Sequence, residues 1–487
     1  MQAPQPILEQ AALRRIEQRH GAAEPPLMQR AGAAAAAQVQ QLIGKAGDRP
    51  LLVAGPGNNG GDALVAALLL RQCGLDPVVV FAGTAEKLPA DARAAHAAWL
   101  ACGGELRAEI PPQSFSLAVD GLFGIGLTRT LEGRYAELVA QLNALPCPVL
   151  ALDVPSGLEA DTGKVLGCAV RADYTASFIA LKPGLLTLDG PDYCGRISVH
   201  DLGLELDAAG ATNAPALFAS ALQPRRRNTH KGEHGSAAII GGAPGMAGAA
   251  LLAGRAALHL GAGRVYVGML DPLPVDPLQP ELMLRDADAA CNLGDCLALG
   301  PGLGTSPRAQ ALLRRGLARE VPLLLDADAI NLLAAHPVLQ KQLRRRNAPS
   351  LLTPHPAEAA RLLGCDTATV QQDRLRACRE LAERCRAGVV LKGCGSIIAF
   401  ADGRWYVNTT GNPGLASAGS GDVLSGMAAA LLAQGVAADQ ALLAATWLHG
   451  AGADACVAGG SGPLGLCASE VSLAARRVRN DCIHAGD

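Results

Sequence analysis

Short runs rich in Leu, Val and Ile alternate along the chain with longer Ala- and Leu-rich stretches whose apolar positions recur at helical spacing. The runs form two groups: LLVAG, PVVVFAG, LAVDGLFG and PVLALDVPSG between residues 51 and 157, and SAAIIGG, RVYVGML, CLALGPG, VPLLLDADA, SLLTPHP and GVVLKGCG between residues 236 and 395. Strands that alternate with helices in this way predict parallel sheets joined by right-handed crossovers. The sequence therefore predicts an α/β protein built in two halves.

A segment of different composition separates the two groups. Residues 204–236 are rich in Ala, Pro and Asn, and then in basic residues. A chain of 487 residues also exceeds the size of one ordinary hydrophobic core. We place a domain boundary near residue 215, which predicts domains of residues 1–215 and 216–487.

Composition and charge narrow the classes of function. The chain has 42 basic and 44 acidic residues, and only 3% of its residues are aromatic, so neither a strong overall field nor an aromatic groove favours nucleic acid. The basic run Arg225 to His234 contains no aromatic residue, and we interpret it as a solvated end of the linker. The chain begins without a signal-like apolar segment, and its 14 cysteines match no zinc pattern. We expect a cytoplasmic protein that binds neither a membrane nor nucleic acid.

The first strand-to-helix turn has the sequence GPGNNGGDA, Gly55 to Ala63. Its glycines would permit positive φ and a close approach of backbone N–H groups to a ligand at the start of a helix. Asn58 and Asn59 add side-chain oxygens that can coordinate a cation. The simpler alternative is that the asparagines supply left-handed turns and that Asp62 caps the helix.

Two further strand ends carry polar side chains. Asp120 ends the run in VDGLFGIGLTRT, and Asp153 and Ser156 follow the next run in LDVPSGL. Ligands of open α/β sheets bind where several strands deliver their carboxyl ends to one edge. Three such ends with amides or carboxylates favour a binding site over independent helix caps.

The motifs NNGGD, DGLFGIGL, DVPSG and FIALKPGL occur in this order and together resemble the epimerase domain of the NAD(P)H-hydrate repair enzymes, over most of residues 10–210. The resemblance implies a Rossmann-like three-layer domain that binds hydrated NADH or NADPH (NADHX or NADPHX). It also implies a potassium ion held by Asn59, Asp120 and Ser156. The implied hydrate-binding residues are Asn58, Asn59, Gly60, Gly61, Asp62, Gly124, Ile125, Gly126, Leu127, Thr128, Arg129, Thr130 and Asp153.

Epimerisation at C6 of the hydrated ring needs proton transfer to and from the departing oxygen, for which a positioned carboxylate is suited. Asp153 is the candidate acid/base. Lys182, in LKPGL, is a second candidate, although an ordinary surface lysine explains it as well.

The second half contains no GxxxxGK[ST] motif and so does not predict a P-loop enzyme. It does contain NTTGNPGLASAGSGDVLSGM, in which Gly419, Ser420 and Gly421 can present N–H groups to an anion and Asp422 can remove a proton from an alcohol. Other strand-end loops are LKGCGS, LTPHPAE with His355 between two prolines, GPGLG and DADAIN.

These motifs, with the stretch from Gly241 to Val265, resemble the ADP/ATP-dependent NAD(P)H-hydrate dehydratase domain over roughly residues 225–480, which implies a ribokinase-like α/β fold. The implied reaction phosphorylates the 6-hydroxyl with help from Asp422 and then eliminates phosphate. It uses ADP or ATP with Mg²⁺, and the sequence leaves the choice of nucleotide open. The implied nucleotide-binding residues are Lys392, Gly393, Cys394, Gly395, Ser396 and Gly421, and the implied hydrate-binding residues are Ala249, Gly302, His355 and Asp422.

Two alternatives from other classes stay open at this point. One is a small-alcohol, vitamin-precursor kinase fused to a nucleotide-binding domain, which would release a stable phosphorylated product. The other makes the first half a non-catalytic lipid or protein interaction module; Asp153, Asp120 and the paired asparagines argue against it, because an interaction surface does not need converging polar strand ends. For the repair enzyme, we expect a homo-oligomer whose partners are the hydrate and an adenine nucleotide.

Overall fold

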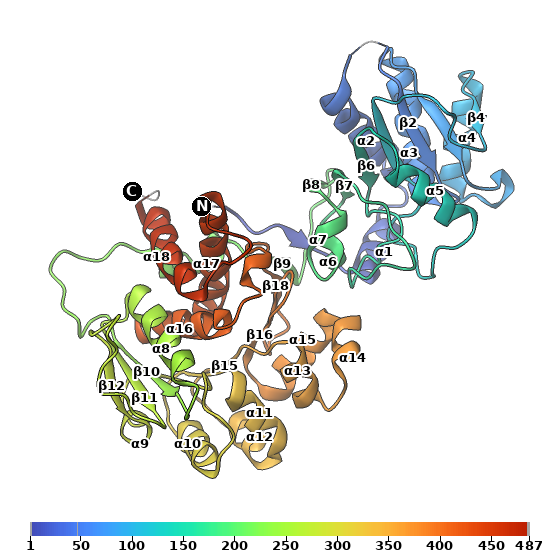
Figure 1. Ribbon diagram of the computed structural model, residues 1–487. Coiled ribbons are helices and arrows are strands. Elements are labelled where there is room, and N and C mark those ends of the chain that lie inside the picture. Colours follow the sequence, from blue (N-terminus) through green and yellow to red (C-terminus); the bar gives the residue numbers. More distant parts are fainter. Residues whose placement is uncertain (1, 46, 485–487) are drawn as a thin grey trace. The chain divides into compact units, whose positions relative to one another are not determined.

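The computed structural model describes residues 2–45 and 47–484 (Figure 1). The chain divides into two compact units. The first unit is Gln5–Ala209, and the second unit runs from Gly210 onward and includes the first residues of the chain.

The first unit is built on a parallel sheet of seven strands among its described residues. The strand order is β4 (Leu106–Arg107), β3 (Val78–Phe81), β2 (Pro50–Ala54), β5 (Leu117–Gly121), β6 (Val149–Leu152), β7 (Tyr174–Phe178) and β8 (Arg196–His200). A short strand, β1 (Pro6–Ile7), precedes the helices. The helices are α1 (Gln10–Arg19), α2 (Leu27–Ile43), α3 (Asn58–Gln72), α4 (Ala90–Ala101), α5 (Arg134–Asn143), α6 (Pro183–Leu186) and α7 (Gly190–Tyr193), with a 3₁₀ turn η1 (Ala85–Lys87).

Helices cover both faces of this sheet. Successive residues of a strand point to opposite faces, so Leu52 packs with α2, α3 and α4 while Leu51 and Val53 pack with α5. Buried on both faces, the strands are continuous apolar runs, which is why the sequence signals them clearly. The first unit is therefore the predicted three-layer α/β fold.

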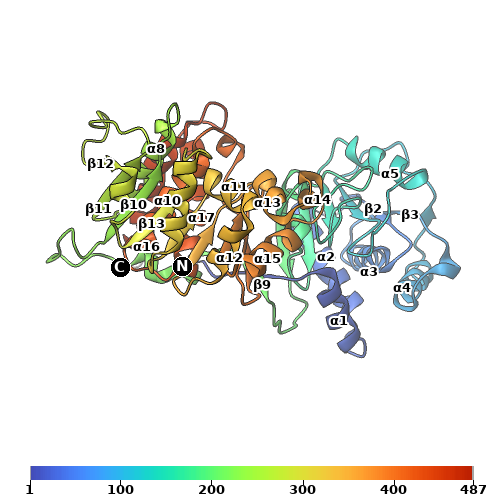
Figure 2. The ribbon, with the colours of Figure 1, turned by 90° about the horizontal axis from the view of Figure 1, so that it is seen from below.

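The second unit has a larger, mixed sheet (Figure 2). Its strand order is β9 (Gly210–Thr212), β18 (Trp405–Val407), β17 (Ile397–Ala399), β16 (Gly388–Leu391), β15 (Ser350–Leu352), β14 (Leu323–Leu325), β13 (Cys296–Leu299), β10 (Ser236–Gly241), β11 (Arg264–Met269) and β12 (Met283–Asp286). The strands from β16 to β12 are parallel, but β17 is antiparallel to both β16 and β18. The prediction of wholly parallel sheets was wrong at this edge, because three-residue strands joined by tight turns need no helical crossover.

Helices also cover both faces of the second sheet. On one face lie α8 (Ala247–His259), α16 (Ser420–Ala433), α17 (Ala438–Ala458) and α18 (Ala468–His484), packed on alternate residues such as Ile239 and Ala298. On the other face α10 (Pro307–Leu317) packs on Leu299, which a Cβ at Gly316 would approach to 2.6 Å. The remaining helices are α9 (Ala287–Ala290), α11 (Ala327–Ala335), α12 (Pro337–Arg344), α13 (Pro356–Leu363), α14 (Thr367–Gln372) and α15 (Arg374–Cys385), with 3₁₀ turns η2 (Pro215–Leu222) and η3 (Pro413–Leu415).

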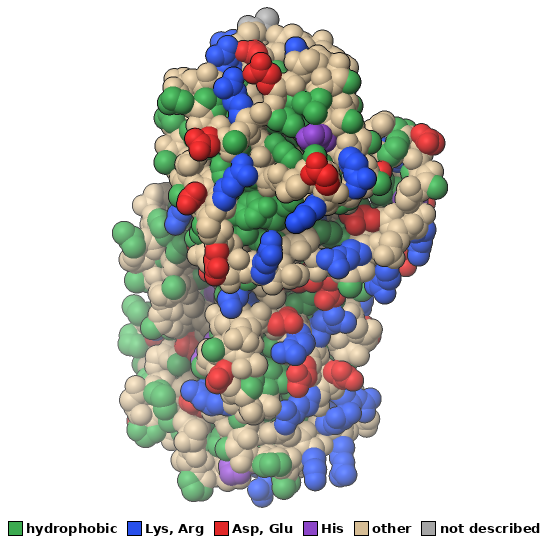
Figure 3. Space-filling model, turned by 90° about the vertical axis from the view of Figure 1, so that its right-hand side faces the viewer, with side chains coloured by type: hydrophobic (Ala, Val, Ile, Leu, Met, Phe, Trp, Pro, Cys, Tyr) green, Lys and Arg blue, Asp and Glu red, His purple; other side chains and the backbone are tan. Residues whose placement is uncertain are grey.

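The small residues of this chain serve close helix packing. A Cβ at Gly426 of α16 would lie 2.0 Å from the backbone oxygen of Ala253 in α8, so only glycine permits this approach. Ala-rich helices that pack this closely fill a core without aromatic bulk. One described helix, α17, is long and apolar enough to cross a membrane, but 61% of its most apolar 18-residue segment is buried inside the protein. Basic and acidic side chains are interspersed on the face drawn in Figure 3.

Candidate active sites

In the first unit, residues Asn58–Asp62 form the first turn of α3 rather than a loop before it. None of the glycines or asparagines from Gly55 to Gly61 has positive φ. The glycines are required instead for close packing: a Cβ at Gly60 would lie 2.1 Å from the oxygen of Gly55, and one at Gly55 would lie 1.8 Å from that of Leu122. The prediction of positive φ in this turn was wrong. The alternative, with left-handed asparagines and Asp62 as the helix cap, was also wrong, because α3 begins at Asn58, four residues before Asp62.

Asp120 and Ser156 meet as predicted at the carboxyl edge of the sheet. Asp120 is fully buried, and its carboxylate accepts hydrogen bonds from Ser156 Oγ at 2.7 Å, Ser156 N at 2.8 Å and Leu122 N at 3.2 Å. Burial raises the pKa of Asp120 to about 6, although the hydrogen bonds from Ser156 and Leu122 lower it. The group is thus an acid without an ion-pair partner among the described residues.

Asn59 lies beside this pair and is also buried. Its Nδ2 donates to Leu152 O at 3.3 Å, but its buried Oδ1 has no hydrogen-bond partner among the described residues. A Cβ at Gly124 would lie 3.5 Å from Asn59 Cγ and 2.8 Å from Asp153 Oδ2, so the loop after β5 can approach both side chains only because residue 124 is glycine. A buried acceptor without a donor is costly and indicates a missing partner.

Asp153 stands directly after β6 with φ at +66°, an unusual conformation for a residue other than glycine. Its Oδ2 accepts from Ile125 N at 3.2 Å, and its Oδ1 forms an ion pair with Lys182 Nζ. Lys182 is 1% exposed and also donates to Ser177 Oγ at 3.0 Å and Phe178 O at 2.8 Å. The interpretation of Lys182 as an ordinary surface lysine was therefore wrong, because three acceptors around it compensate its burial.

The other residues implied for the hydrate are divided between this cluster and its rim. Asp62 is buried, and its pKa is raised well above the ordinary value by burial and by the charges of Asp153 and Glu17. Leu127 is buried, whereas Gly126 and residues 128–130 are exposed, and no hydrogen bond or ion pair among the described residues joins Thr128, Arg129 or Thr130 to Asp153.

Helix α1 contributes two residues that the sequence analysis missed. The side-chain amide of Gln10 donates to Ile125 O, next to the amide that binds Asp153. Glu17 follows on the same helix, and its pKa is raised by burial first and by the charge of Asp153 next, while the charge of Lys182 lowers it. No local signal distinguishes these residues from other polar residues of a surface helix.

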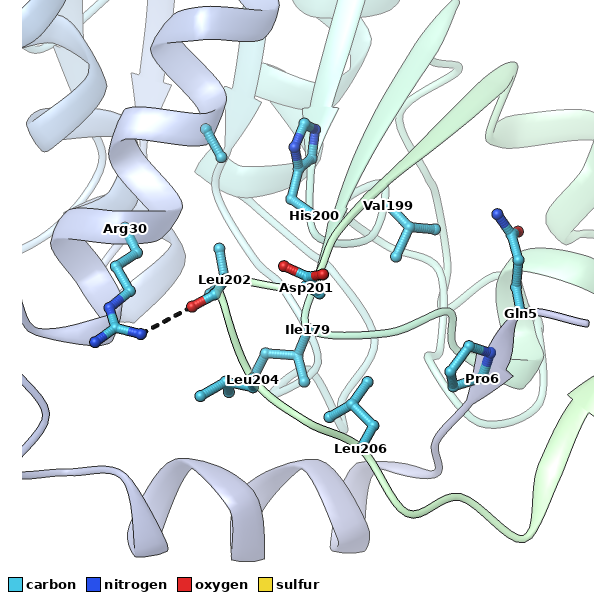
Figure 4. Close-up of a pocket in the computed structure, with 11 residues that line it drawn as sticks. Gln5, Pro6, Arg30, Ile179, Val199, His200, Asp201, Leu202, Leu204 and Leu206 are labelled. Atoms are coloured by element: carbon cyan, nitrogen blue, oxygen red, sulfur yellow. Dashed lines mark hydrogen bonds between the residues drawn. The ribbon is translucent and has the colours of Figure 1, made fainter. Parts of the chain in front are cut away.

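A separate cavity of about 720 Å³ lies between α2 and the ends of β7 and β8, and it does not include Asp153. Arg30 points toward the carbonyl of Leu202 and donates to it at 2.9 Å (Figure 4). The lining residues are Gln5, Pro6, Arg30, Ala34, Ile179, Val199, His200, Asp201, Leu202, Leu204 and Leu206.

In the second unit, a lysine and two buried carboxylates lie at the carboxyl edge of the sheet. Lys392 Nζ lies 2.8 Å from Asp326 Oδ1 and 4.0 Å from Glu358 Oε2, while Ser425 Oγ donates to Asp326 Oδ2 at 2.7 Å. Burial alone would lower the pKa of Lys392, but the charges of Asp326 and Glu358 outweigh it and raise the pKa. This ammonium group stays charged across the physiological range.

The GSGD motif forms the start of α16 beside this lysine. Gly419 precedes the helix with φ at +87°, and a Cβ at Gly421 would lie 3.1 Å from Lys392 Nζ. Asp422 has no ion pair among the described residues, and its pKa is raised to about 6 by burial first and by the charge of Asp326 next, while Lys392 lowers it. A carboxylate with this pKa is suited to accept a proton near neutral pH.

His355 approaches the same cluster through Glu358. His355 N donates to Glu358 Oε2 at 2.8 Å, and its Nε2 lies 3.2 Å from Glu358 Oε1. Burial opposes ionisation of Glu358, but hydrogen bonds from His355 and the charge of Lys392 outweigh it and lower the pKa. The structure thus links Lys392, Gly421, Asp422 and His355 at one edge.

Ala249, in the first turn of α8, meets Gly302, in the loop after β13. Gly302 has φ at +58°, and a Cβ there would lie 3.1 Å from Ala249 Cβ and 2.5 Å from Met246 O. Gly304 N donates to Asp328 at 2.8 Å, and the charge of Asp328 also raises the pKa of Asp422. Ala249 and Gly302 are therefore connected to Asp422 only indirectly, through Gly304 and Asp328.

The loop after β16 is held by its own residues and by Arg374. Gly393 has φ at +149°, and a Cβ there would lie 2.6 Å from Arg374 Nη1. Ser396 Oγ donates to Gly393 O at 3.1 Å, which closes the loop. Cys394 is exposed. The backbone from Lys392 to Ser396 is thereby fixed with its start beside Gly421.

Sequence analysis gave no role to Asp326, Glu358 or His449. DADAIN and LTPHPAE were recognised as strand-end loops, but nothing in them identified the carboxylates that hold Lys392. His449 of α17 is buried near Ser420 with its Nε2 unpartnered among the described residues, and burial lowers its pKa to about 4.

Comparison with known proteins decides the family. Residues 24–184 match the model described as YjeF-related protein N-terminus, and residues 237–465 match the model described as NAD(P)H-hydrate dehydratase. The chain is 38% identical over 444 residues to a bifunctional NAD(P)H-hydrate repair enzyme of Escherichia coli, which covers 88% of this chain and 85% of the relative. The chain belongs to the bifunctional NAD(P)H-hydrate repair enzymes.

A relative from Coxiella burnetii with the same description is 38% identical and covers 94% of this chain and 96% of its own length. Among solved structures, a ribokinase-like superfamily protein from Enterococcus faecalis is 25% identical with a TM-score of 0.50, covering 57% of this chain and 98% of that chain. This confirms the ribokinase-like fold.

As a member of this family, the enzyme epimerises the R and S hydrates of NADH and NADPH at C6, in its first unit. It dehydrates the S hydrate back to NAD(P)H in a nucleotide-dependent reaction, in its second unit. The kinase alternative is not supported, because the matching relatives are described as repair enzymes over both halves of the chain.

Proposed function

We propose that the cluster around Asp153 is the epimerase centre. The observation that carries this is the strained Asp153, fixed from one side by Lys182 and from the other by Ile125 N, at the edge to which Asn59, Asp62 and Asp120 also contribute. Asp153 transfers protons to and from the oxygen that leaves or joins C6. Residues 58–62 and 124–130 bind the rest of the hydrated nucleotide.

The substitution Asp153→Asn tests this assignment. It keeps the size and the hydrogen bond from Ile125 N but removes the proton-transfer group, so epimerisation should slow by about 10²–10⁴-fold while hydrate binding persists. The rate of R to S conversion is measured by separating the epimers over time. An unchanged rate would remove Asp153 from the mechanism.

A potassium ion fits the oxygens beside this centre. Asn59 Oδ1 is a buried acceptor without a partner in the part of the chain that the structure describes, and the buried Asp120 carboxylate and Ser156 Oγ lie at the same strand ends. Hard cations prefer such oxygen ligands. We assign Asn59, Asp120 and Ser156 to K⁺, whose charge would balance that of Asp120 and help to hold the loop after β5.

Replacing K⁺ by choline in the assay tests this. Epimerisation should fall and be restored by K⁺ in a saturable manner, while dehydration in the same samples provides the control. Full epimerase activity in choline would contradict the assignment.

We propose that the dehydratase centre is the edge where Lys392, Gly421, Asp422 and His355 come together. Lys392 to Ser396 and Gly421 bind the adenine nucleotide, Asp422 takes the proton of the 6-hydroxyl during phosphorylation, and Ala249, Gly302 and His355 bind the hydrate. The amides at the start of α16 stabilise the transferring phosphoryl group. The observation that carries this is the position of Lys392 Nζ beside Gly421, next to Asp422, which has no ion pair within residues 2–45 and 47–484.

Mg²⁺ enters this centre with the nucleotide. Among the described residues, no group of three His, Cys, Asp or Glu side chains could hold a metal, which suits an ion carried mainly by phosphate oxygens. Such an ion neutralises charge between the phosphates during transfer. Assays with ADP or ATP, each with and without Mg²⁺, test the requirement and settle the preferred nucleotide.

The proposed domain limits are residues 1–215 for the epimerase and 216–487 for the dehydratase, which fall between the two family matches. We also propose a cytoplasmic homo-oligomer that binds neither nucleic acid nor membrane. The near-balanced charge supports the absence of nucleic-acid and membrane binding, and size-exclusion chromatography with light scattering tests the oligomer.

A further inference from the structure

Helix α1 is held against the two loops that supply the partners of Asp153. Gln10 donates through its side chain to Ile125 O and through its backbone N to Asp161 Oδ1 at 2.7 Å. Leu13 is 1% exposed and packs in a small core with Ile179 and Ala180, just before Lys182. The helix therefore covers the carboxyl edge at which Asp153 stands.

Glu17 lies on this same face of α1. Positions 10, 13 and 17 are spaced by three and four residues and so share one side of a helix. Gln10 and Leu13 both face the covered edge, which directs Glu17 toward it as well. Unlike Leu13, Glu17 keeps an exposed surface, so its carboxyl can meet a ligand.

The charged groups around Glu17 come from four elements. They are Asp153 after β6, Lys182 after β7, Asp62 on α3 and Arg14 on α1 itself. Partial burial raises the pKa of Glu17, as does the charge of Asp153, while Lys182 and Arg14 lower it. A carboxyl group in this position can hold a proton closer to neutral pH than an ordinary surface glutamate.

Inversion at C6 needs more than one proton-transfer group. The C6–O bond breaks as the hydroxyl takes a proton and leaves as water, and the ring nitrogen lone pair forms an N=C6 double bond. Water then adds to the other face and gives up a proton, which leaves the proton count and the oxidation state unchanged. An acid is needed on the face that loses the hydroxyl and a base on the face that receives water.

We propose that Glu17 is the second proton-transfer residue of the epimerase and acts on the face of C6 opposite Asp153. Asp153 stands at the sheet edge and Glu17 on the helix that covers it, so a ring bound between them meets one carboxyl from each side. The two residues exchange the acid and base roles between the R and S epimers. This inference rests on the proposed epimerase centre at Asp153.

The test compares Glu17→Gln with Arg15→Gln, an exposed position on the opposite side of α1. Glu17→Gln should lower kcat for epimerisation by about 10²-fold or more with little change in KM, and it should remove one limb of the pH profile. Glu17→Asp should recover part of the rate. Arg15→Gln should match the wild type; dehydration in each sample reports the amount of enzyme, and the urea transition of the first unit reports its folding.

A kcat and pH profile of Glu17→Gln equal to those of Arg15→Gln would overturn the proposal. Asp153→Asn, assayed in parallel, distinguishes an error in the role of Glu17 from an error in the location of the epimerase centre. If Asp153→Asn is slow and Glu17→Gln is not, only the role of Glu17 fails. If neither variant is slow, the epimerase centre itself is misplaced.

Discussion

The two centres differ in which carboxylate the lysine holds. In the first unit the buried Lys182 pairs with Asp153, the candidate acid/base itself. In the second unit Lys392 pairs with Asp326 and approaches Glu358, while the candidate base Asp422 stands without an ion pair among the described residues. Both lysines lie at the carboxyl edge of a sheet, yet one orients the reacting group and the other leaves it available.

The difference fits the two reactions. An epimerase must pass protons in both directions, so a carboxylate fixed by an ammonium and a backbone amide maintains one geometry for either epimer. A phosphorylating dehydratase needs a base that takes one proton beside an anionic nucleotide, and it needs the lysine for phosphate. The same residue types at the same edge therefore serve different chemistry according to their pairing.

The largest expected effect is that of Asp422→Ala on dehydration. Removing the base from the second centre should slow dehydration by about 10³–10⁴-fold, because the neighbouring carboxylates of Asp326 and Glu358 are held in ion pairs with Lys392 and His355. Recovery of the 340 nm absorbance measures dehydration, and epimer separation measures the other activity, which should persist. Loss of both activities in folded protein would contradict the assignment of the two activities to separate centres.

Breaking the Lys182 pair should affect stability as well as epimerisation. Lys182→Met leaves Asp153 largely buried without its partner, which should cost about 3–5 kcal/mol in the free energy of unfolding. The urea-induced unfolding of the first unit measures this cost. Lys164→Met, at an exposed position, is the matched control and should have little effect. Equal stability of the two variants would contradict the structural role of the pair.

The pH dependence of dehydration should reflect the ionisation of Asp422. Asp422 must be ionised to accept a proton, and its pKa is raised to about 6. The value of kcat/KM should therefore be flat above pH 7 and fall by about tenfold per pH unit well below pH 6. Because the charge of Asp328 raises this pKa, Asp328→Asn should move the midpoint to lower pH. A midpoint near pH 4 in the unmodified enzyme would argue against Asp422 as the base.

The smallest effect is expected for Ser156→Ala. The substitution removes the 2.7 Å hydrogen bond to buried Asp120 and one proposed ligand of K⁺. It should lower the free energy of unfolding by about 1–3 kcal/mol. The K⁺ concentration that half-activates epimerisation should rise. Ser114→Ala, at an exposed position, is the control. If both variants need the same K⁺ concentration, Ser156 is not a ligand.

Much of the fold could be predicted because its strands are buried on both faces. Runs such as LAVDG and VPLLLDADA stand out as apolar, and the aspartate that closes each apolar run, Asp120 or Asp326, lies at the sheet edge. The three-residue strands β17 and β18 carry too few positions for a pattern, so the antiparallel edge was missed.

The centres could be predicted only where a motif lies directly after a strand. The burial of Lys182 depends on Ser177 and Phe178 O, which become its partners only in the folded chain. Asp326, Glu358 and Glu17 are ordinary acidic residues in sequence, and their roles arise from segments far apart in the chain. Asn58–Asp62 were placed in a turn because glycine usually signals one, whereas here it permits close packing.

The most direct test of two separate centres is complementation with an epimeric mixture of hydrated NADH, nucleotide, Mg²⁺ and K⁺. Asp153→Asn alone should restore absorbance rapidly only up to the fraction of S hydrate, and Asp422→Ala alone should restore almost none. The two variants mixed should recover the whole mixture at a rate close to that of the unmodified enzyme. A mixture that stops at the S fraction would contradict the account.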